Sequence, residues 1–204
     1  DASRALGGKL KTAFLTAAAD AAGRYHYEKG SPVESLRPSM AISTRNESSG
    51  ANAFTPTRMP VTTLQMPITE RFAAINEIIS VAREQAKAAS LDTLATMSAL
   101  LPTTVLTRIA RTQSQTVDFA TSNVRGAGVP LFIGGALVLG NYPVGPLGGV
   151  AFNLTMLSYN HNLDMGLNVD TAAVTDPELL RKCVEESMRE LINSSRPTTV
   201  AVGE

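Results

Sequence analysis

The chain has 204 residues, 44% hydrophobic and 18% charged, a composition typical of a compact globular protein with a sizeable core. The formal net charge is zero, which gives no sign of the basic surface that binds nucleic acid. The single cysteine, Cys183, cannot form an internal disulfide, and such usage indicates a reducing compartment.

The first third of the chain predicts a helix followed by two strands. Residues 9–28 are rich in alanine and carry apolar side chains at helical spacing, and Gly30 marks the end of this helix. Alternation over 36–43 predicts a strand, whereas the polar run 44–57 predicts a surface loop. Residues 61–68 predict a second strand, which the flanking prolines confine to a sheet edge or limit in paired length.

The middle of the chain predicts helices. Thr69 is a suitable N-cap for a long helix over 70–89, whose apolar residues form one stripe. Residues 91–101 and 103–111 predict two further helices, separated by a proline. These segments together form a helical insert over about 70–112.

Four strands are predicted after the insert, over 117–122, 130–139, 150–159 and 163–170. The last two are joined by Asn160-His161-Asn162, a short hairpin connection. The stretch from 126 to 163 carries no Asp, Glu, Lys or Arg, but prolines, glycines and polar residues interrupt the ~20 apolar residues that a transmembrane helix needs. We therefore predict buried strands and no membrane span.

The last predicted element is a helix that starts at Asp176-Pro177-Glu178, where a capping residue, a first-turn proline and an acid coincide. Cys183 lies on its apolar stripe, which favours an inert core thiol over a nucleophile. Ser194 to Glu204 form a flexible tail. The elements together predict an α+β protein in which about six strands form a mixed sheet packed with helices.

The search for chemistry along the chain finds few candidates. The two histidines are His26, at a helix end, and His161, in the hairpin turn, and for both a structural or solvated role is favoured over a ligand role. The sequence has no His or Cys pair at metal spacing, no G-x-S-x-G elbow and no glycine-rich phosphate loop.

One unusual segment is Thr121-Ser122-Asn123-Val124-Arg125-Gly126, at the end of a predicted strand. Its small hydroxyl and amide side chains, followed by glycines, suit hydrogen bonds to a ligand oxygen. A turn in which Asn123 caps backbone groups explains the segment equally well. The residues alone do not decide between the two.

This segment and its surroundings resemble the C-terminal signature of the bacterial wax ester synthase/diacylglycerol acyltransferase (WS/DGAT) family. The resemblance runs from about Ala5 to Ile192 and is densest from Ser122 to Asp170. The residues that carry it are Thr121 to Gly126, Val129-Pro130-Leu131-Phe132, Gly135-Ala136, Tyr142-Pro143-Val144-Gly145-Pro146, Asn153 to Tyr159, and, upstream, Gly7-Gly8, Phe14-Leu15 and Arg24-Tyr25-His26.

The resemblance implies one half of a chloramphenicol-acetyltransferase-like fold, with residues 1–193 as the WS/DGAT C-terminal domain and 194–204 as its tail. In this family two halves enclose a tunnel where acyl-CoA meets diacylglycerol or a long-chain alcohol, giving triacylglycerol or wax ester. Two histidines followed by x-x-x-Asp-Gly lie in the N-terminal half, and the second acts as general base. This sequence lacks that motif, so we expect the chain alone to be inactive.

The resemblance also implies roles for particular residues, none of them catalytic and none a metal ligand. The residues expected to support the substrate tunnel or the oxyanion are Thr121, Ser122, Asn123, Gly126 and Asn153. The family's usual Asn-Asp pair corresponds here to Lys11-Thr12, a departure that puts full activity in doubt unless it is a tolerated variation at a helix start.

The expected partners are an N-terminal catalytic half, in the same parent chain or a separate one, with acyl-CoA as a substrate rather than a bound cofactor. We expect a cytoplasmic protein with loose peripheral contact to a membrane or lipid droplet, and no nucleic acid partner. Two alternatives remain, namely an inactive homologue that binds lipid or acyl-CoA, and a module that only docks a partner chain.

Overall fold

The computed structural model describes residues 2–43, 54–88, 104 and 116–194. The chain divides into two compact units, which we describe separately. The helical unit comprises Asp1–Ser35, Thr62–Ile79 and Glu178–Glu204, and the sheet unit comprises Leu36–Val61 and Ser80–Pro177. The helices predicted over 91–101 and 103–111 lie outside the described residues, as do residues 44–53 of the predicted loop and residues 195–204 of the predicted tail.

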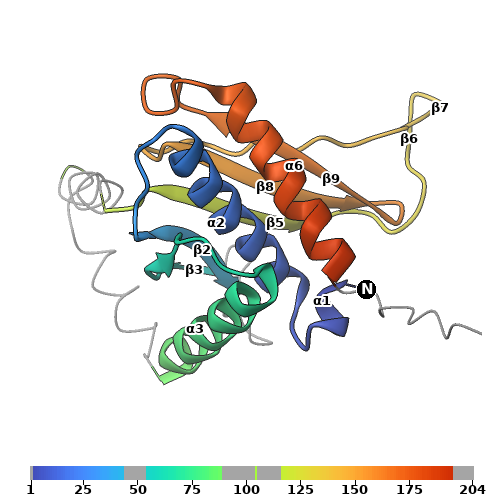
Figure 1. Cartoon of the computed structure of the whole chain (residues 1–204). Helices are drawn as coiled ribbons and strands as arrows, with labels where there is room; N and C mark the ends of the chain where they lie inside the picture. Colours follow the sequence, from blue (N-terminus) through green and yellow to red (C-terminus); the bar gives the residue numbers. More distant parts are fainter. Residues whose placement is uncertain (1, 44–53, 89–103, 105–115, 195–204) are drawn as a thin grey trace, which may run out of the picture. The chain divides into compact units, whose positions relative to one another are not determined.

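The helical unit is built from α1 (Ala2–Ala5), α2 (Leu10–Glu28), the first half of α3 (Ile68–Ala88) and α6 (Pro177–Ser194) (Figure 1). The predicted first and last helices are confirmed. Helix α2 is buried over most of its length because its alanines allow close packing. Ala13, Ile68, Phe72 and Leu191 form a buried apolar cluster within this unit.

Helix α3 begins earlier than predicted, so the N-cap assignment of Thr69 is wrong. Ile68 is already helical, and the N–H groups of Glu70 and Arg71 both donate to the carbonyl oxygen of Pro67, at 3.1 Å. The strand predicted over 61–68 is correspondingly short. It is only β4 (Val61–Thr62), which pairs with β1 (Ser35–Leu36). The carbonyl oxygens of Thr62 and Leu64 accept hydrogen bonds from the Arg71 side chain.

The sheet unit contains a five-stranded mixed sheet in the order β3-β2-β5-β8-β9. Strands β2, β5 and β8 run parallel, while β3 and β9 are antiparallel edge strands (Figure 1). The mixed α+β sheet is thus confirmed, with five strands in the main sheet of the described residues. The bounds are β2 Pro38–Ser43, β3 Phe54–Arg58, β5 Phe119–Arg125, β8 Phe152–Tyr159 and β9 Asn162–Val169.

Strand β3 corrects the predicted loop, which was wrong over its last residues. Ser43 to Ser39 pair antiparallel with Phe54 to Arg58, and Pro56 lies opposite Ala41. Proline has no N–H to donate, and it is tolerated here because β3 is an edge strand. The prolines and polar residues that indicated a loop are therefore compatible with a sheet edge.

The predicted hairpin between β8 and β9 is confirmed. Tyr159 pairs with Asn162, so only Asn160 and His161 form the turn, and both have positive φ, of 43° and 68°. A two-residue turn with left-handed backbone at both positions matches the twist of the strands it joins.

The strand predicted over 130–139 is wrong in length and in burial. It is replaced by two short strands, β6 (Phe132–Ile133) and β7 (Ala136–Leu137), which pair antiparallel. Gly134 and Gly135 have φ of 58° and 88°, so the chain reverses between them. Phe132 is 65% and Ile133 75% exposed, because this hairpin does not join the main sheet.

Candidate functional site

Strand β5 carries most of the predicted site residues and lies between β2 and β8 in the main sheet. Side chains alternate along a strand, so Thr121 and Asn123 point to one face and Ser122 to the other. Burial decreases along β5, from buried Phe119 to exposed Asn123, Val124 and Arg125. The carboxyl end of this central strand is therefore open to solvent.

The hydroxyl of Thr121 is buried without a hydrogen-bond partner among the residues that the structure describes. Its side chain is 4% exposed, and its strand neighbours are Met40 in β2 and Leu154 in β8. A buried hydroxyl without a partner costs about 1–3 kcal/mol, and native structures retain few such groups. Thr121 is thus the predicted site residue with unused hydrogen-bonding capacity.

The opposite face of the sheet is occupied by a network of side-chain amides. Asn153 is 5% exposed, donates from Nδ2 to the carbonyl of Pro146 at 2.7 Å, and accepts from Thr155 Oγ1 at 2.9 Å. Asn168 Nδ2 donates to the carbonyl of Gly145 at 2.6 Å. In this structure Asn153 and Asn168 thus hold the carbonyl groups of Pro146 and Gly145 against the sheet.

Two glycines allow close backbone approaches in the sheet unit, Gly145 to the amide network and Gly126 to strand β8. A Cβ on Gly145 would lie 2.4 Å from Thr155 Oγ1, and one on Gly126 would lie 2.1 Å from the carbonyl oxygen of Ser158. The N–H of Gly126 also donates to Ser158 Oγ at 3.2 Å. Gly126, predicted as a site residue, is therefore packed against β8 at the end of β5.

The five predicted tunnel residues do not converge on one point. Thr121 and Asn123 share one face of β5, while Ser122 shares the other face with Asn153, because Ser122 pairs with Thr155 and Ala120 with Asn153. Gly126 lies beyond both sets. Thr121 is the member whose polar group is buried without a hydrogen-bond partner among the described residues.

Lys11 and Thr12, which the resemblance predicts to replace the family's Asn-Asp pair, lie at the start of α2. Thr12 is 1% exposed, and its hydroxyl donates to Asn76 Oδ1 of α3 at 3.2 Å. The carbonyl of Thr12 accepts from Thr16 Oγ1 at 2.8 Å. Lys11 is half-buried beside it. Thr12 thus joins α2 to α3 within the helical unit.

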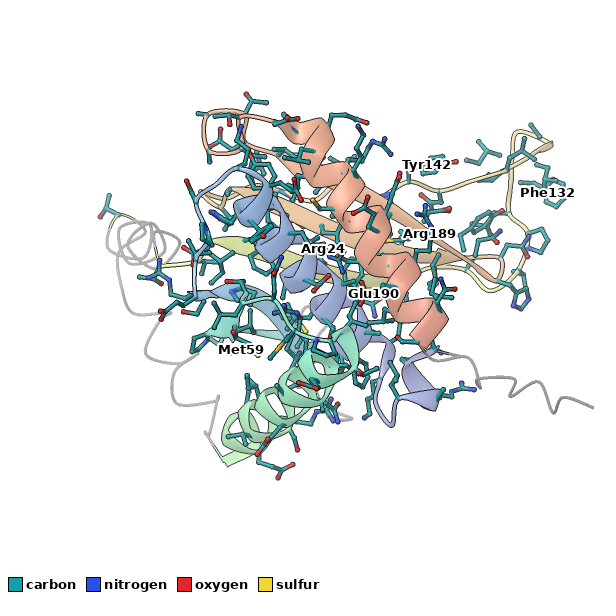
Figure 2. The ribbon with its side chains drawn as sticks, viewed as in Figure 1. Arg24, Met59, Phe132, Tyr142, Arg189 and Glu190 are labelled. Carbon is teal, nitrogen blue, oxygen red and sulfur yellow. The ribbon has the colours of Figure 1, made fainter. Side chains whose placement is uncertain are left out.

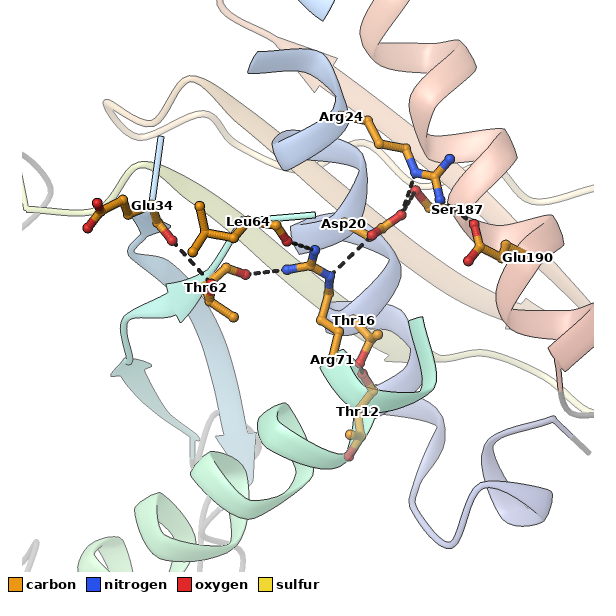
Figure 3. Close-up of polar contacts among 10 residues, drawn as sticks. All are labelled: Thr12, Thr16, Asp20, Arg24, Glu34, Thr62, Leu64, Arg71, Ser187 and Glu190. Carbon is orange, nitrogen blue, oxygen red and sulfur yellow. Dashed lines mark hydrogen bonds and ion pairs between the residues drawn. The ribbon is translucent and has the colours of Figure 1, made fainter. Parts of the chain in front are cut away.

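A buried charge cluster in the helical unit was not predicted (Figure 3). Arg71 is 1% exposed, and its Nε lies 3.2 Å from Asp20 Oδ1. Its other nitrogens donate to the carbonyls of Thr62 and, at 2.6 Å, Leu64. Burial lowers the pKa of Arg71, and the neighbouring Asp20 only partly opposes this effect. The isolated aspartate within the alanine-rich run of α2 was the available sequence signal.

The second oxygen of Asp20 connects α2 to α6. Asp20 Oδ2 accepts from Ser187 Oγ at 2.7 Å and from Arg24 Nε at 2.6 Å, and Arg24 also pairs with Glu190. Burial would lower the pKa of Arg24, but its bonds to Asp20 and Glu190 outweigh this and raise it. These polar groups are mutually satisfied, so the cluster fixes three helices together rather than presenting a site.

The remaining candidates take structural positions. His26 Nδ1 lies 3.2 Å from the carbonyl of Ser31, and His161 is exposed in the β8–β9 turn. Cys183 is buried, and this burial raises the pKa of its thiol, in agreement with the predicted inert role. Within the described ranges no group of three or more His, Cys, Asp or Glu side chains is placed to hold a metal ion.

Sequence comparisons relate this chain to the WS/DGAT family. The profile of the WS/DGAT C-terminal domain matches residues 50–192. A Mycobacterium tuberculosis H37Rv protein named "Putative diacyglycerol O-acyltransferase Rv2484c" is 28% identical over 200 residues, which are 94% of this chain and 39% of that protein. A second one, Rv3740c, is 34% identical over 117 residues, or 57% of this chain and 25% of its own length.

Solved structures support the same fold. The wax ester synthase/diacylglycerol acyltransferase from Marinobacter aquaeolei VT8 superposes with a TM-score of 0.72 at 20% identity, over 95% of this chain and 46% of that one. A condensation domain of the enacyloxin polyketide synthase gives a TM-score of 0.56 at 14% identity, over 100% and 40%. The predicted acetyltransferase-like α+β fold is confirmed. The chain spans less than half the length of these relatives. Because the profile of the WS/DGAT C-terminal domain matches residues 50–192, the chain belongs to the WS/DGAT family.

Proposed function

We propose that this chain is the C-terminal half of an acyl-CoA-dependent O-acyltransferase that makes triacylglycerol or wax ester, and that it forms one wall of the substrate tunnel. The observation that carries the proposal is the family match over 50–192, combined with a coverage of only 39% and 46% of the relatives' lengths. The relatives extend well beyond the region that this chain matches. We call that remaining part of a family member the complementary segment.

The reaction needs a group that removes the proton from the acceptor hydroxyl as the oxygen attacks the thioester carbonyl. The two histidines of this chain do not form the family's motif, and both take structural or solvated positions. The complementary segment supplies the general base. The chain alone is therefore inactive, and the pair transfers the acyl group from sulfur to the acceptor oxygen, releasing the free thiol of CoA.

The role of β5 is to line the tunnel near the thioester. The hydroxyl of Thr121 supports this role, because it is a donor without a hydrogen-bond partner in the described part of the chain and can meet a substrate oxygen. Asn123 lies on the same strand face and is exposed. A donor placed at the developing oxyanion contributes about 3–4 kcal/mol of transition-state stabilisation. Ser122 and Asn153 then support the wall from the opposite face of the sheet, and Gly126 supports it through the close approach of its backbone to β8.

In this proposal the protein meets its lipid substrates as a peripheral protein at the surface of a membrane or lipid droplet. No helix within the described parts of the chain is long and apolar enough to cross a bilayer. Diacylglycerol and long-chain alcohols reside in membranes or droplets, so the enzyme collects them at that interface, in the cytoplasm.

One observation favours an alternative function, a homologue that binds lipid or acyl-CoA without turnover. Thr12 stands where the resemblance predicts the aspartate of the family's Asn-Asp pair. Its buried hydroxyl carries no charge and donates to the neutral amide of Asn76. A module that only docks a partner chain is a further alternative, and it predicts no ligand binding at all.

The experiment compares this chain, the complementary segment and the two together in an assay with radiolabelled acyl-CoA and either diacylglycerol or a long-chain alcohol. We expect transfer only from the pair, and a loss of transfer when the motif's second histidine is changed to alanine. Turnover by this chain alone would overturn the proposal. A pair that binds acyl-CoA with the histidines intact but transfers nothing identifies the inactive homologue, and a pair that binds neither ligand identifies the docking module.

A further inference from the structure

Strand β2 leaves its parallel neighbour β5 after a short stretch of pairing. The shared register covers Pro38–Met40 of β2 and Phe119–Thr121 of β5 and stops there. Strand β2 nevertheless continues to Ser43 along β3, and β5 continues to Arg125 along β8. The two strands therefore separate toward their carboxyl ends. The separation begins at Thr121, whose buried hydroxyl has no hydrogen-bond partner among the described residues.

The separation leaves one backbone edge of β5 open over residues 123–125. A central strand directs its N–H and C=O groups alternately to the neighbours on its two sides. On one side these residues pair with β8, whereas on the side that β2 has left no strand of the described chain pairs with them. An open strand edge of this kind can bind an extended chain that carries amide groups.

Arg125 lies at the end of this open edge, exposed to solvent. The ion pairs formed within the described residues engage Arg24, Arg37, Arg71 and Arg181, and Arg125 belongs to none of them. It is also the last charged residue before the charge-free stretch from 126 to 163. Arg125 is therefore a cation available for an anionic ligand.

The side chains that share the face of Arg125 carry no compensating charge. They are Asn123 in β5, Ser158 in β8 and Leu163 in β9, which the strand register places on that face. Asp164, the acid of β9, lies on the opposite face, where its Oδ2 accepts from the N–H of Asn141 at 3.2 Å. The neighbouring strands thus leave the guanidinium without a counterion.

The spacing along β5 suits a ligand with a reactive group at one end and an anion at the other. Thr121, Asn123 and Arg125 share one face, and burial falls from the first to the last. At about 3.3 Å per residue, the Cα atoms of Thr121 and Arg125 lie about 13 Å apart. An anion remains hydrated at the exposed end, because its burial would be costly.

The phosphopantetheine arm of acyl-CoA presents its groups in this order, namely a thioester, amides and a phosphate. A guanidinium binds phosphate through paired hydrogen bonds. Of the proposed substrates, acyl-CoA is the anion, whereas diacylglycerol and long-chain alcohols carry no charge. The cation therefore selects the acyl donor rather than the acceptor.

We propose that Arg125 binds the phosphate that ends the pantetheine arm of acyl-CoA, while the open edge of β5 holds the amides of that arm. The thioester then reaches Thr121. This inference deepens the proposed acyltransferase and rests on it.

The test measures acyl transfer by the assembled pair with different donors, namely acyl-CoA, acyl-dephospho-CoA, which lacks only the 3′-phosphate, and acyl-pantetheine, which has no phosphate. We expect Arg125→Gln to raise the KM for both phosphate-bearing donors about tenfold or more, because a hydrogen-bonded charge contact is lost. The kcat should stay within about twofold, since the contact is equally strong in the ground state and the transition state. With acyl-pantetheine the variant should match the unchanged pair.

Arg189→Gln is the matched control. Arg189 projects from α6 (Figure 2), is exposed and lies outside the ion pairs named above, so its loss should leave every KM unchanged. Arg125→Lys keeps the charge without the planar fork and should recover part of the affinity. Arg125 is exposed, so its variants retain the fold, which far-UV circular dichroism verifies.

Several outcomes would overturn the proposal. They are an unchanged KM for acyl-CoA in Arg125→Gln, an effect that disappears with acyl-dephospho-CoA, and an equal effect with acyl-pantetheine. Weaker binding of Arg125→Gln to phosphatidylglycerol vesicles, with the KM for acyl-CoA unchanged, would instead assign the cation to a lipid headgroup.

Hydrogen exchange tests the open edge itself. Adding CoA to the pair should slow exchange at one or more amides of residues 123–125, and Arg125→Gln should reduce this protection at a subsaturating CoA concentration. If these amides are already protected before CoA is added, a strand of the complementary segment occupies the edge and the proposal fails.

The same samples separate this inference from the proposed function. CoA binding that depends on Arg125, measured by titration calorimetry in a pair that transfers no acyl group, retains the phosphate site and rejects the acyltransferase. Normal acyl transfer with a KM that does not depend on Arg125 retains the acyltransferase and rejects the phosphate site.

Discussion

Arg71 and Asp20 form a buried ion pair across 51 positions of sequence, with 3.2 Å between Arg71 Nε and Asp20 Oδ1. The guanidinium also donates to the carbonyls of Thr62 and Leu64, so one side chain joins α2 to the backbone that leads from β4 into α3. Asp20 in turn accepts from Arg24 and Ser187.

Replacing Arg71 with Met should destabilise the chain strongly. The substitution leaves the Thr62 and Leu64 carbonyls without their donor and removes one cation from buried Asp20. Breaking a buried pair in this way costs about 3–5 kcal/mol, measurable by urea unfolding. Arg181→Met is the control, since Arg181 pairs with Glu178 and Glu185 on an exposed surface of α6 and should unfold with the wild type. Equal midpoints for both variants would contradict the structural role of Arg71.

Thr121→Val should separate stability from function. Because the Thr121 hydroxyl is buried without a hydrogen-bond partner among the residues the structure describes, an isosteric methyl group should leave the free energy of unfolding unchanged or raise it. If the hydroxyl contacts the developing oxyanion, acyl transfer by the assembled pair should fall by about a hundredfold or more. Thr155→Val is the matched control, because its hydroxyl is bonded to Asn153 and its loss should destabilise by about 1–3 kcal/mol. Unchanged transfer in Thr121→Val would remove this residue from the proposed wall.

Gly126→Ala should lower the stability of the chain, whereas Gly128→Ala should leave it unchanged. A Cβ at Gly126 would lie 2.1 Å from the carbonyl oxygen of Ser158, so β5 and β8 must separate locally. Such overpacking costs about 1–3 kcal/mol. Gly128 has nothing within 4 Å of the corresponding position, so Gly128→Ala serves as the control two residues away. Thermal unfolding of the two variants would show the difference, and similar melting temperatures would mean that the close approach is not required.

Cys183 should make the stability fall at alkaline pH. Burial raises the pKa of its thiol above the unfolded value of about 8.5, so the unfolded chain loses this proton first. The stabilisation from the neutral buried thiol is therefore complete below that unfolded pKa and is lost as pH rises through the folded pKa. Unfolding measured from pH 7 to 10 should show a decline that Cys183→Ala lacks. Parallel pH profiles would contradict the burial, as would rapid reaction of the folded protein with a disulfide reagent at pH 7.5.

The local pattern predicted the elements whose signals lie within a few residues. Asp176-Pro177 starts α6 because a cap and a first-turn proline act on the adjacent backbone, and Asn160-His161 makes the two-residue turn because the flanking strands alternate. Strands β5, β8 and β9 were also predicted to within about three residues, β9 from its alternation and β8 from its apolar run. The family resemblance, carried by the run that ends at Gly126, is confirmed by the profile match.

The sequence could not distinguish a buried strand from an exposed hairpin over 130–139. The apolar side chains are identical in both cases, and Gly134-Gly135 was the signal of a reversal. Thr69 was misassigned because a threonine before an apolar stripe is a good N-cap, yet the carbonyl of Pro67 already begins the helix. All the predicted site residues remain predictions, Thr121 included, as do the helices between 91 and 111.

By itself the sequence determined the family, the order of the main elements and the absence of the two-histidine motif, because these depend on residues near one another in the chain. The tertiary structure decided that Arg71 meets Asp20 and that the β6–β7 hairpin stays exposed. It also decided that the Thr121 hydroxyl is buried without a hydrogen-bond partner within the described residues. Those outcomes depend on which distant segments exclude water from a side chain, and this is set by packing across the fold rather than by local pattern.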